Sequence, residues 1–260
     1  MSVPHRPRRR FSQNFLIEQS IIANIVRAVA PQPHDAMVEI GPGLGALTYP
    51  LASRVQALHV VEIDRDIVAR LRAAFPPQRL VIHEGDALEF DFASLGPRLR
   101  VVGNLPYHIS TPLLFHLASS AAALCDIHVM LQDEVVQRMV APPGSSEYGR
   151  LSVMLQYTFD MEHVLHVPPS AFKPAPKVDS AVVRMLPRAE GSPRAQDERA
   201  FAQTVAAAFS QRRKTLRNTL GRLLTPDDFT ALGIDPQARA QTLSVADFIR
   251  IADHRTWQMA

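Results

Sequence analysis

The sequence has very little cysteine and no long apolar segment. Cys125 is the only cysteine, which excludes a disulfide framework and a zinc site built from thiolates. No apolar run approaches the roughly 20 residues that a membrane-spanning helix needs. The charged opening, residues 1–11, lacks the apolar stretch of a secretory signal. We therefore expect a cytoplasmic protein with no membrane partner.

Metal-ligand patterns and internal repeats are also missing. None of the ten histidines stands at a ligand spacing with other ligands nearby, so we predict no metal site. What is present is typical of a soluble globular protein, with 47% hydrophobic and 20% charged residues. A length of 260 residues allows one large domain, or a moderate one followed by a small one.

Basic residues concentrate at the two ends of the chain. Residues 1–34 hold five Lys or Arg and one acid, and residues 184–260 hold twelve and eight, so each end carries +4. Residues 35–183 hold eleven basic and sixteen acidic residues, a net charge of −5. Basic ends favour contact with an anionic partner such as a phosphate backbone. Ordinary solvated surface charge is the alternative.

Apolar runs alternate with amphipathic segments through the first half of the chain. This alternation predicts a parallel sheet with helices on both faces. Two further apolar runs follow with no helical pattern between them, which predicts a closing strand hairpin. Ser110 or Thr111 is expected to cap one helix, with Pro112 in its first turn. The seven strands are expected near residues 36–41, 57–64, 79–88, 98–104, 125–132, 162–169 and 180–186.

The composition changes after the last of these strands. Residues 187–198 are rich in Pro, Gly, Ser and charge, which is typical of a linker. Only helical patterns follow it. We therefore predict an α/β domain over residues 1–188 and a small all-helical domain over residues 189–260.

Polar residues at the predicted strand ends indicate a nucleoside-binding pocket. Ligands of such sheets bind beyond the carboxyl ends of the strands. Gly41, Gly43 and Gly45 follow the first strand, where a glycine turn lets backbone N–H groups approach a ligand. Glu62 ends the second strand and can accept bonds from ribose hydroxyls. Asp86 follows the third strand and can accept from an adenine amino group.

The spacing of the glycines helps to choose the cofactor. It is G-x-G-x-G and not the dinucleotide pattern G-x-G-x-x-G, and NAD would require a pyrophosphate grip. S-adenosylmethionine carries an amino-acid tail that a glycine loop can hold instead. The series resembles the S-adenosylmethionine-dependent class I methyltransferases, whose Rossmann-like sheet also ends in a strand hairpin.

The segment Asn104-Leu105-Pro106-Tyr107 stands at the predicted end of the fourth strand. It resembles the N/D-P-P-Y motif of amino-group methyltransferases. Acceptors on the amine hydrogens, from the Asn104 side chain and the Pro106 carbonyl, would localise the lone pair of an adenine amine toward a sulfonium methyl. Tyr107 can stack on the base. A rigid turn with a core tyrosine is the alternative.

The chain resembles the KsgA/RsmA-type rRNA adenine N6,N6-dimethyltransferases over nearly its whole length. The last three of the matching segments separate this family from other methyltransferases. The segments are "SQNFL" (12–16), "EIGPGLGALT" (39–48), "EIDRD" (62–66), "GNLPY" (103–107), "YGRLSVMLQ" (148–156), "FKPAPKVDSAVV" (172–183) and "QRRKTLRN" (211–218).

The resemblance implies the roles of particular residues. Phe172 would lie opposite Tyr107, so that an adenine extracted from its RNA could be held between the two rings. The implied substrate is a pair of adjacent adenosines in the 3′-terminal hairpin loop of small-subunit (16S) rRNA, and the enzyme is expected to be monomeric and to serve subunit maturation. The residues implied to contact S-adenosylmethionine are Asn14, Leu16, Gly41, Glu62, Asp86 and Asn104.

One position departs from the family pattern, and three alternatives stay open. His108 replaces a second Asn that usually follows the motif tyrosine, and we assign it no role. The alternatives are Erm-type methylation of 23S rRNA, methylation of DNA adenine, and a non-catalytic RNA-binding assembly factor. The basic runs 6–10 and 212–217 are candidates for binding phosphates in the RNA readings.

Overall fold

The computed structural model describes residues 14–259, with side chains described as far as residue 254. The chain forms two compact units, and the runs 1–11 and 6–10 considered above lie outside the described residues. The first unit contains the chain up to residue 136 together with residues 160–187. The second contains residues 137–159 and 188–260.

This division differs from the predicted pair of continuous domains. The observed boundary at 187/188 lies next to the predicted one, but residues 137–159 belong to the second unit. The physical reason is that the side chains of Tyr148, Val153 and Tyr157 are buried in the hydrophobic core of the helical unit, in one cluster with Phe201. Residues 137–159 thus complete a core that is otherwise built from residues near the end of the chain.

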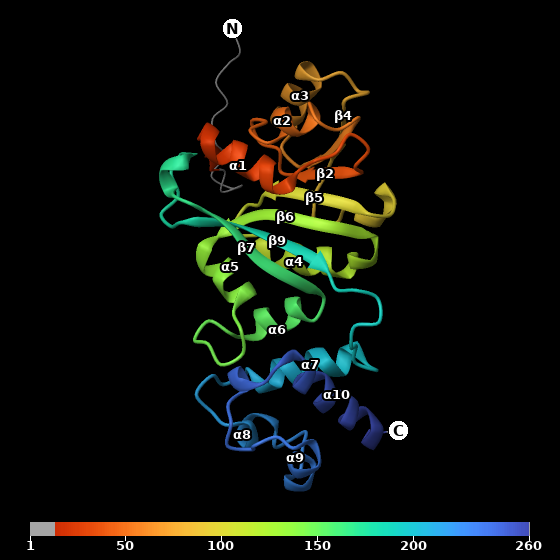
Figure 1. Ribbon diagram of the computed structural model, residues 1–260, viewed down its shortest axis with the longest axis vertical. Helices are drawn as coiled ribbons and strands as arrows, with labels where there is room; N and C mark the ends of the chain where they lie inside the picture. The colour runs from red at the N-terminus through yellow and green to blue at the C-terminus, as the bar shows by residue number, and fades with distance from the viewer. Residues whose placement is uncertain (1–13, 260) are drawn as a thin grey trace. The chain divides into compact units, whose positions relative to one another are not determined.

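Seven strands form a single sheet in the order β4-β3-β2-β5-β6-β9-β7 (Figure 1). The pairs from β4 through to β6 are parallel, and β9 is antiparallel to β6. This confirms the predicted α/β sheet of seven strands. The strands are β2 (Met37–Ile40), β3 (Leu58–Glu62), β4 (Leu80–Glu84), β5 (Leu99–Asn104), β6 (Leu124–Gln132), β7 (Phe159–Val167) and β9 (Ser180–Pro187).

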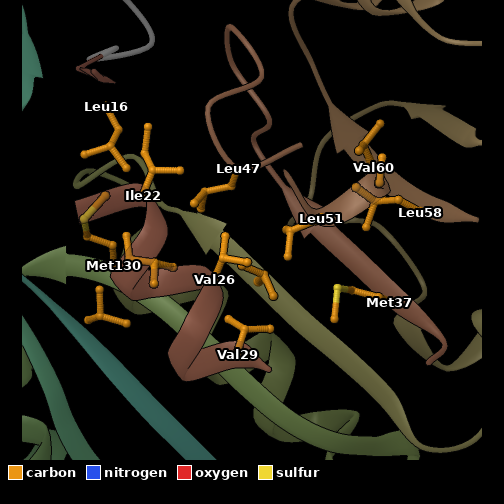
Figure 2. Close-up of a cluster of buried hydrophobic side chains, with 14 of the residues drawn as sticks. Leu16, Ile22, Val26, Val29, Met37, Leu47, Leu51, Leu58, Val60 and Met130 are labelled. Carbon is orange, nitrogen blue, oxygen red and sulfur yellow. The ribbon is translucent and has the colours of Figure 1, made fainter. Parts of the chain in front are cut away.

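Helix α1 covers one face of the sheet and fixes the start of the described chain. It spans Gln19–Val29, and its buried residues Ile22, Val26 and Val29 recur at helical spacing on one side. Figure 2 shows these side chains in one cluster with strand residues such as Met130. Burial of each large apolar side chain stabilises the unit by about 1.5–3 kcal/mol, so this packing holds α1 against the sheet.

The other helices of the first unit follow the strands as the sequence predicts. One detail was wrong: α4 begins at Ser110 with Ile109 at the cap position, and the Ser110 hydroxyl donates to the carbonyl of Tyr107 at 2.9 Å instead of capping the helix. The helices are α2 (Thr48–Ala52), α3 (Arg65–Ala74), α4 (Ser110–Ser119) and α5 (Asp133–Val140), which runs across the boundary at residue 136.

A second, two-stranded sheet was not predicted. Strand β1 (Phe15–Leu16) pairs antiparallel with β8 (Phe172–Lys173), with Leu16 opposite Phe172. Strands of two residues carry no alternation that a sequence pattern could show. This pair joins the beginning of the described chain to the segment that precedes β9.

The second unit is helical after the linker, as predicted. Its core brings together residues from all of its longer helices. Its helices are α6 (Arg150–Gln156), α7 (Glu198–Ala208), α8 (Leu216–Leu220), α9 (Pro226–Leu232) and α10 (Val245–Met259). Across residues 14–259, none of the helices has both the length and the apolar character needed to cross a membrane.

Candidate functional site

A cavity of about 240 Å³ lies at the carboxyl ends of the parallel strands of the first unit. Glu62 is the last residue of β3, Asn104 is the last of β5, and Asp86 follows β4 by two residues. Because parallel strands end at one edge of the sheet, residues far apart in the sequence meet there. Its wall contains every residue expected to contact the cofactor, namely Asn14, Leu16, Gly41, Glu62, Asp86 and Asn104.

The backbone of the turn after β2 favours glycine. Gly41 and Gly43 have φ values of +66° and +53°, which side-chain-bearing residues rarely adopt. A Cβ atom on Gly43 would also lie 3.2 Å from the ring of Phe15. The N–H of Gly41 donates to the carbonyl of Val61 at 3.0 Å, which ties the turn to β3. Glycine thus lets the backbone itself form this part of the wall.

Two carboxylates are held by backbone groups at the strand ends. Glu62 is buried, and its Oε1 accepts the N–H of Asp64 at 2.8 Å. Burial raises the pKa of Glu62, and the backbone N–H of Asp64 opposes this shift. Asp86 is half-buried, and its Oδ1 accepts the N–H of Leu88 at 2.9 Å. Both acids are therefore fixed in orientation before a ligand enters.

A third acid of the wall, Glu39, was missed at the sequence level. It lies within β2, is 2% exposed, and its Oε2 has no hydrogen-bond partner in the described part of the chain. Burial raises the pKa of Glu39 to about 8, and the negative charge of Glu62 adds to the shift. The available signal was a glutamate inside the apolar run 36–41, where a strand covered on both faces has no structural use for a charge.

The chemistry of this wall fits a cationic ligand better than an anionic one. Glu39, Glu62 and Asp86 all line it, and the described lining contains no Lys or Arg. A pyrophosphate would meet carboxylates here instead of the positive charges that it requires. S-adenosylmethionine carries a sulfonium and an ammonium group together with a ribose and an adenine, so the residues present fit this cofactor.

The side chain of Asn104 is oriented by a single hydrogen bond. Its Nδ2 donates to the backbone carbonyl of Asn14 at 3.1 Å. That contact uses the amide nitrogen, and Oδ1 accepts no bond from residues 14–259. The carbonyl oxygen is therefore available as an acceptor for an amine in the cavity.

Pro106 and Tyr107 also line the cavity, with different constraints. The carbonyl of Pro106 already accepts the N–H of Ile109 at 3.1 Å, so one of its two lone pairs remains for a substrate. The phenol oxygen of Tyr107 lies 2.7 Å from Oγ of Ser180. Burial raises the pKa of the Tyr107 phenol, which keeps the group neutral at physiological pH.

Phe172 is not brought to the cavity, contrary to expectation. It is 4% exposed, belongs to the hydrophobic cluster beneath α1 and pairs through its backbone with Leu16. Its ring is used in the core, so among the described residues Phe172 does not line the cavity with Tyr107. His108, by contrast, is exposed and forms part of the cavity wall.

The fold and the chemistry of this cavity wall are those of a methyltransferase of class I with its Rossmann-like sheet. The sequence of the chain specifies the family more narrowly. Residues 4–256 match the model of the ribosomal RNA adenine dimethylase family, and the chain belongs to that family. It is thus an S-adenosylmethionine-dependent rRNA adenine dimethylase, and the resemblance found in the sequence is confirmed.

Individual relatives agree with this assignment. The ribosomal RNA small subunit methyltransferase A of Thiobacillus denitrificans is 62% identical over 244 residues, covering 94% of this chain and 96% of the relative. A crystal structure of a dimethyladenosine transferase from Plasmodium falciparum superimposes with a TM-score of 0.79 at 26% identity, covering 91% and 95% of the two chains. The 23S rRNA methyltransferase ErmE gives 0.75 at 26% identity, covering 93% and 99%.

These matches decide between the alternatives to different degrees. The fold is shared with a dimethyladenosine transferase and with a 23S rRNA methyltransferase, so the fold alone does not choose the target. The reading as a non-catalytic assembly factor loses its support, because the family is one of dimethylases and the acids of the cavity are all present.

Proposed function

We propose that this enzyme dimethylates the N6 amino groups of two adjacent adenosines in the 3′-terminal hairpin loop of 16S rRNA, within the small ribosomal subunit or its precursor. The observation that carries the choice of substrate is the name shared by relatives at 54–62% identity, ribosomal RNA small subunit methyltransferase A. ErmE, whose name gives 23S rRNA, matches at only 26%. We further propose that the enzyme acts in the cytoplasm, as a monomer, during subunit maturation.

Different residues of the cavity wall would bind different parts of the cofactor. Glu62 would accept hydrogen bonds from the ribose hydroxyls, and Asp86 would accept one from the adenine amine. The backbone N–H that each carboxylate accepts supports these roles, because it orients the acid. The turn at Gly41 and the segment Asn14–Leu16 would contact the remainder of the molecule. When bound, S-adenosylmethionine supplies a methyl group made electrophilic by its sulfonium.

Asn104 would act on the target amine. The lone pair of an adenine N6 is delocalised into the ring, so the free base is a weak nucleophile. Oδ1 of Asn104 can accept one amine hydrogen, and the second lone pair of the Pro106 carbonyl can accept the other. Two acceptors favour a tetrahedral nitrogen whose lone pair points away from the ring. Positioning of this kind supplies much of the rate when the electrophile is already strong.

Tyr107 would bind the target base by stacking. Base stacking on an aromatic ring is worth about 1–3 kcal/mol, and the phenol is neutral, so its ring carries no charge to desolvate. Phe172 can complete a sandwich only by leaving the core, and we keep its participation as a prediction. The wall must also admit an amine that already carries one methyl group.

The test of this function is methylation of small-subunit particles from a strain that lacks the activity. The purified enzyme and labelled S-adenosylmethionine should place dimethyladenosine at two neighbouring positions near the 3′ end of the 16S rRNA, mapped by nucleoside analysis. Label in 23S rRNA would favour the Erm-type alternative, and label in DNA would favour methylation of DNA adenine. Either outcome would sink the proposal.

We propose the second unit as the part that binds rRNA phosphates. Arg212, Arg213, Lys214 and Arg217 of the basic run are all exposed. The double variant Arg213→Ala/Arg217→Ala should weaken binding to the small-subunit particle and reduce the slope of log K against log salt by about 2, or about 1 per lost contact. Arg199→Ala, an exposed arginine of the same unit outside the run, is the matched control. Equal slopes for the double variant and the wild type would refute this role.

A further inference from the structure

The hydroxyl of Ser180 contacts Tyr107, and the mechanism proposed above gives this contact no role. Oγ of Ser180 lies 2.7 Å from the phenol oxygen of Tyr107, although the two residues stand 73 positions apart. Ser180 is completely buried and does not line the cavity. The bond therefore approaches Tyr107 from the protein interior, through the end of the ring that carries the hydroxyl.

The two partners differ in how firmly their backbones are held. Ser180 is the first residue of β9 and pairs with Gln132 in the antiparallel ladder. The carbonyl of its neighbour Asp179 accepts the N–H of Asp133 at 3.0 Å. Tyr107 lies instead in the turn between β5 and α4, outside regular structure. The backbone of Ser180 is thus held in the sheet, so its hydroxyl can restrain the ring of Tyr107, whose own backbone lies in a turn.

We propose that Ser180 is a positioning residue for methyl transfer, which holds the ring of Tyr107 at the angle that receives the target adenine. The inference rests on the proposed function, in which that ring stacks on the base. The bond fastens the ring at the end that carries the hydroxyl, while Tyr107 also lines the cavity. The bond also ties the loop that contacts the amine to segment 172–180, whose other end is the buried Phe172.

Loss of the bond has a defined physical consequence. In Ser180→Ala the phenol loses its partner, and the ring is free to turn toward another acceptor or toward water. The cofactor-binding residues are untouched, because none of them contacts Ser180 by a hydrogen bond. A positioning defect should therefore appear in the methyl-transfer rate and leave cofactor affinity unchanged.

The experiment measures single-turnover transfer to small-subunit particles, with S-adenosylmethionine affinity measured separately by calorimetry. Ser180→Ala should slow transfer about tenfold, the equivalent of one hydrogen bond. Tyr107→Phe removes the other hydroxyl and should slow it similarly. The double variant should be no slower than the slower single variant, because both changes remove one interaction. Ser180→Thr, which keeps the hydroxyl, should recover most of the rate.

Controls separate this inference from the function on which it rests. Ser119→Ala removes a serine hydroxyl that donates to the carbonyl of His116 at 2.7 Å in the same unit, and it should leave the rate unchanged. If the wild type transfers no methyl group to the small subunit, the proposed function fails. If the wild type is active, full activity of Ser180→Ala, additive losses in the double variant, or an equal loss of cofactor affinity would each overturn the role of Ser180. Should Ser180→Ala fail to fold, Tyr107→Phe still decides, since full activity without the phenol hydroxyl excludes the role.

Discussion

The two ends of the parallel strands differ in how their charged side chains are paired. At the amino end, Arg100 of β5 bonds Asp35 at 2.6 Å, Asp126 of β6 at 2.7 Å and the carbonyl of Val29 at 2.6 Å. The hydrogen bond with Asp126 raises the pKa of Arg100 still further, so this charge is permanent. The cation also lies at the carboxyl end of α1, where the helix dipole favours it. Other residues of the chain therefore pair this half-buried charge fully.

At the carboxyl end the chain leaves its charges incomplete. Glu39, Glu62 and Asp86 converge on the cavity with no Lys or Arg in its described wall. The Oε2 atom of Glu39 has no partner in the described part of the chain, and burial raises the pKa of Glu39 to about 8. Such an arrangement costs stability in the free protein and is kept where a ligand completes it. The contrast indicates that acids paired with a cation stabilise the fold. Acids that line a cavity without a cation beside them mark a binding site.

Asn104 offers the largest effect at the carboxyl end. Asn104→Ala should reduce methyl transfer by at least about 10²–10³-fold, because the acceptor for the amine is lost. The free energy of unfolding should change little, since the lost side chain makes one half-buried hydrogen bond. Asn24→Ala is the control with the same substitution, since Asn24 of α1 is also half-buried and its Oδ1 accepts one bond, from Arg27 at 3.0 Å. Near-normal transfer by Asn104→Ala would refute the role given to the carboxamide.

Arg100 tests the amino end in the complementary way. Arg100→Ala should lower the free energy of unfolding by about 3 kcal/mol, because it leaves Asp35 and Asp126 without their cation. Urea denaturation measures this loss. Below the melting range, the transfer rate per folded molecule should equal that of the wild type. Arg72→Ala breaks an exposed pair with Glu84 and should cost less than about 1 kcal/mol. A large change in transfer rate by folded Arg100→Ala would break the separation between the two ends.

Replacing Glu39 should raise the free energy of unfolding at high pH, whereas replacing Arg100 should lower it. The folded pKa of Glu39, about 8, is above the ordinary value of 4.5, so its contribution to stability is full below pH 4.5 and is lost as pH rises through 8. Glu39→Gln cannot ionise and escapes this loss. Between pH 5 and pH 9 the variant should gain on the wild type by on the order of 2 kcal/mol or more in urea denaturation without cofactor. A parallel pH dependence of the two proteins would show that Glu39 is not held in a desolvated state.

The sequence predicted the part of the site that depends on strand order. Glu62, Asp86 and Asn104 end separate apolar runs, and any parallel arrangement of those runs brings them to one edge. The position of Phe172 could not be predicted in this way. A motif fixes which residue is present but not whether its ring faces the core, and here pairing of β8 with β1 turns it inward.

The division of the chain into units escaped prediction for a related reason. Residues 137–159 look like the continuation of the alternating pattern, and nothing local marks their side chains for the core of the helical unit. Only long-range packing assigns Tyr148 and Tyr157 to that core. Tyr157, for example, stacks on Phe201 with ring centroids 4.2 Å apart and accepts the N–H of Ala195 at 3.0 Å. Contacts between distant segments have no signature in a single sequence.

His128 is a buried group that gives the smallest of the expected effects. Both of its ring nitrogens are buried without a hydrogen-bond partner in the described residues, yet His128 does not line the cavity at the carboxyl ends of the strands. Burial lowers the pKa of His128 to about 4, so the ring is neutral, with Asp126, Arg100 and Arg184 as its charged neighbours. An unpartnered polar atom therefore marks a ligand site only where it also faces a cavity.

This neutral ring makes a measurable prediction for stability. Because the folded pKa is below the ordinary value of 6.5, stability from His128 is present above pH 6.5 and is lost as pH falls toward 4. Between pH 7 and pH 5 the wild type should lose about 1–2 kcal/mol more than His128→Gln does. Since His59 and His83, whose pKa values burial also lowers, are unchanged in the variant, the difference between the two proteins isolates His128. Identical losses would mean that the ring is protonated or hydrated in the fold, and it would then belong with the paired charges around Arg100.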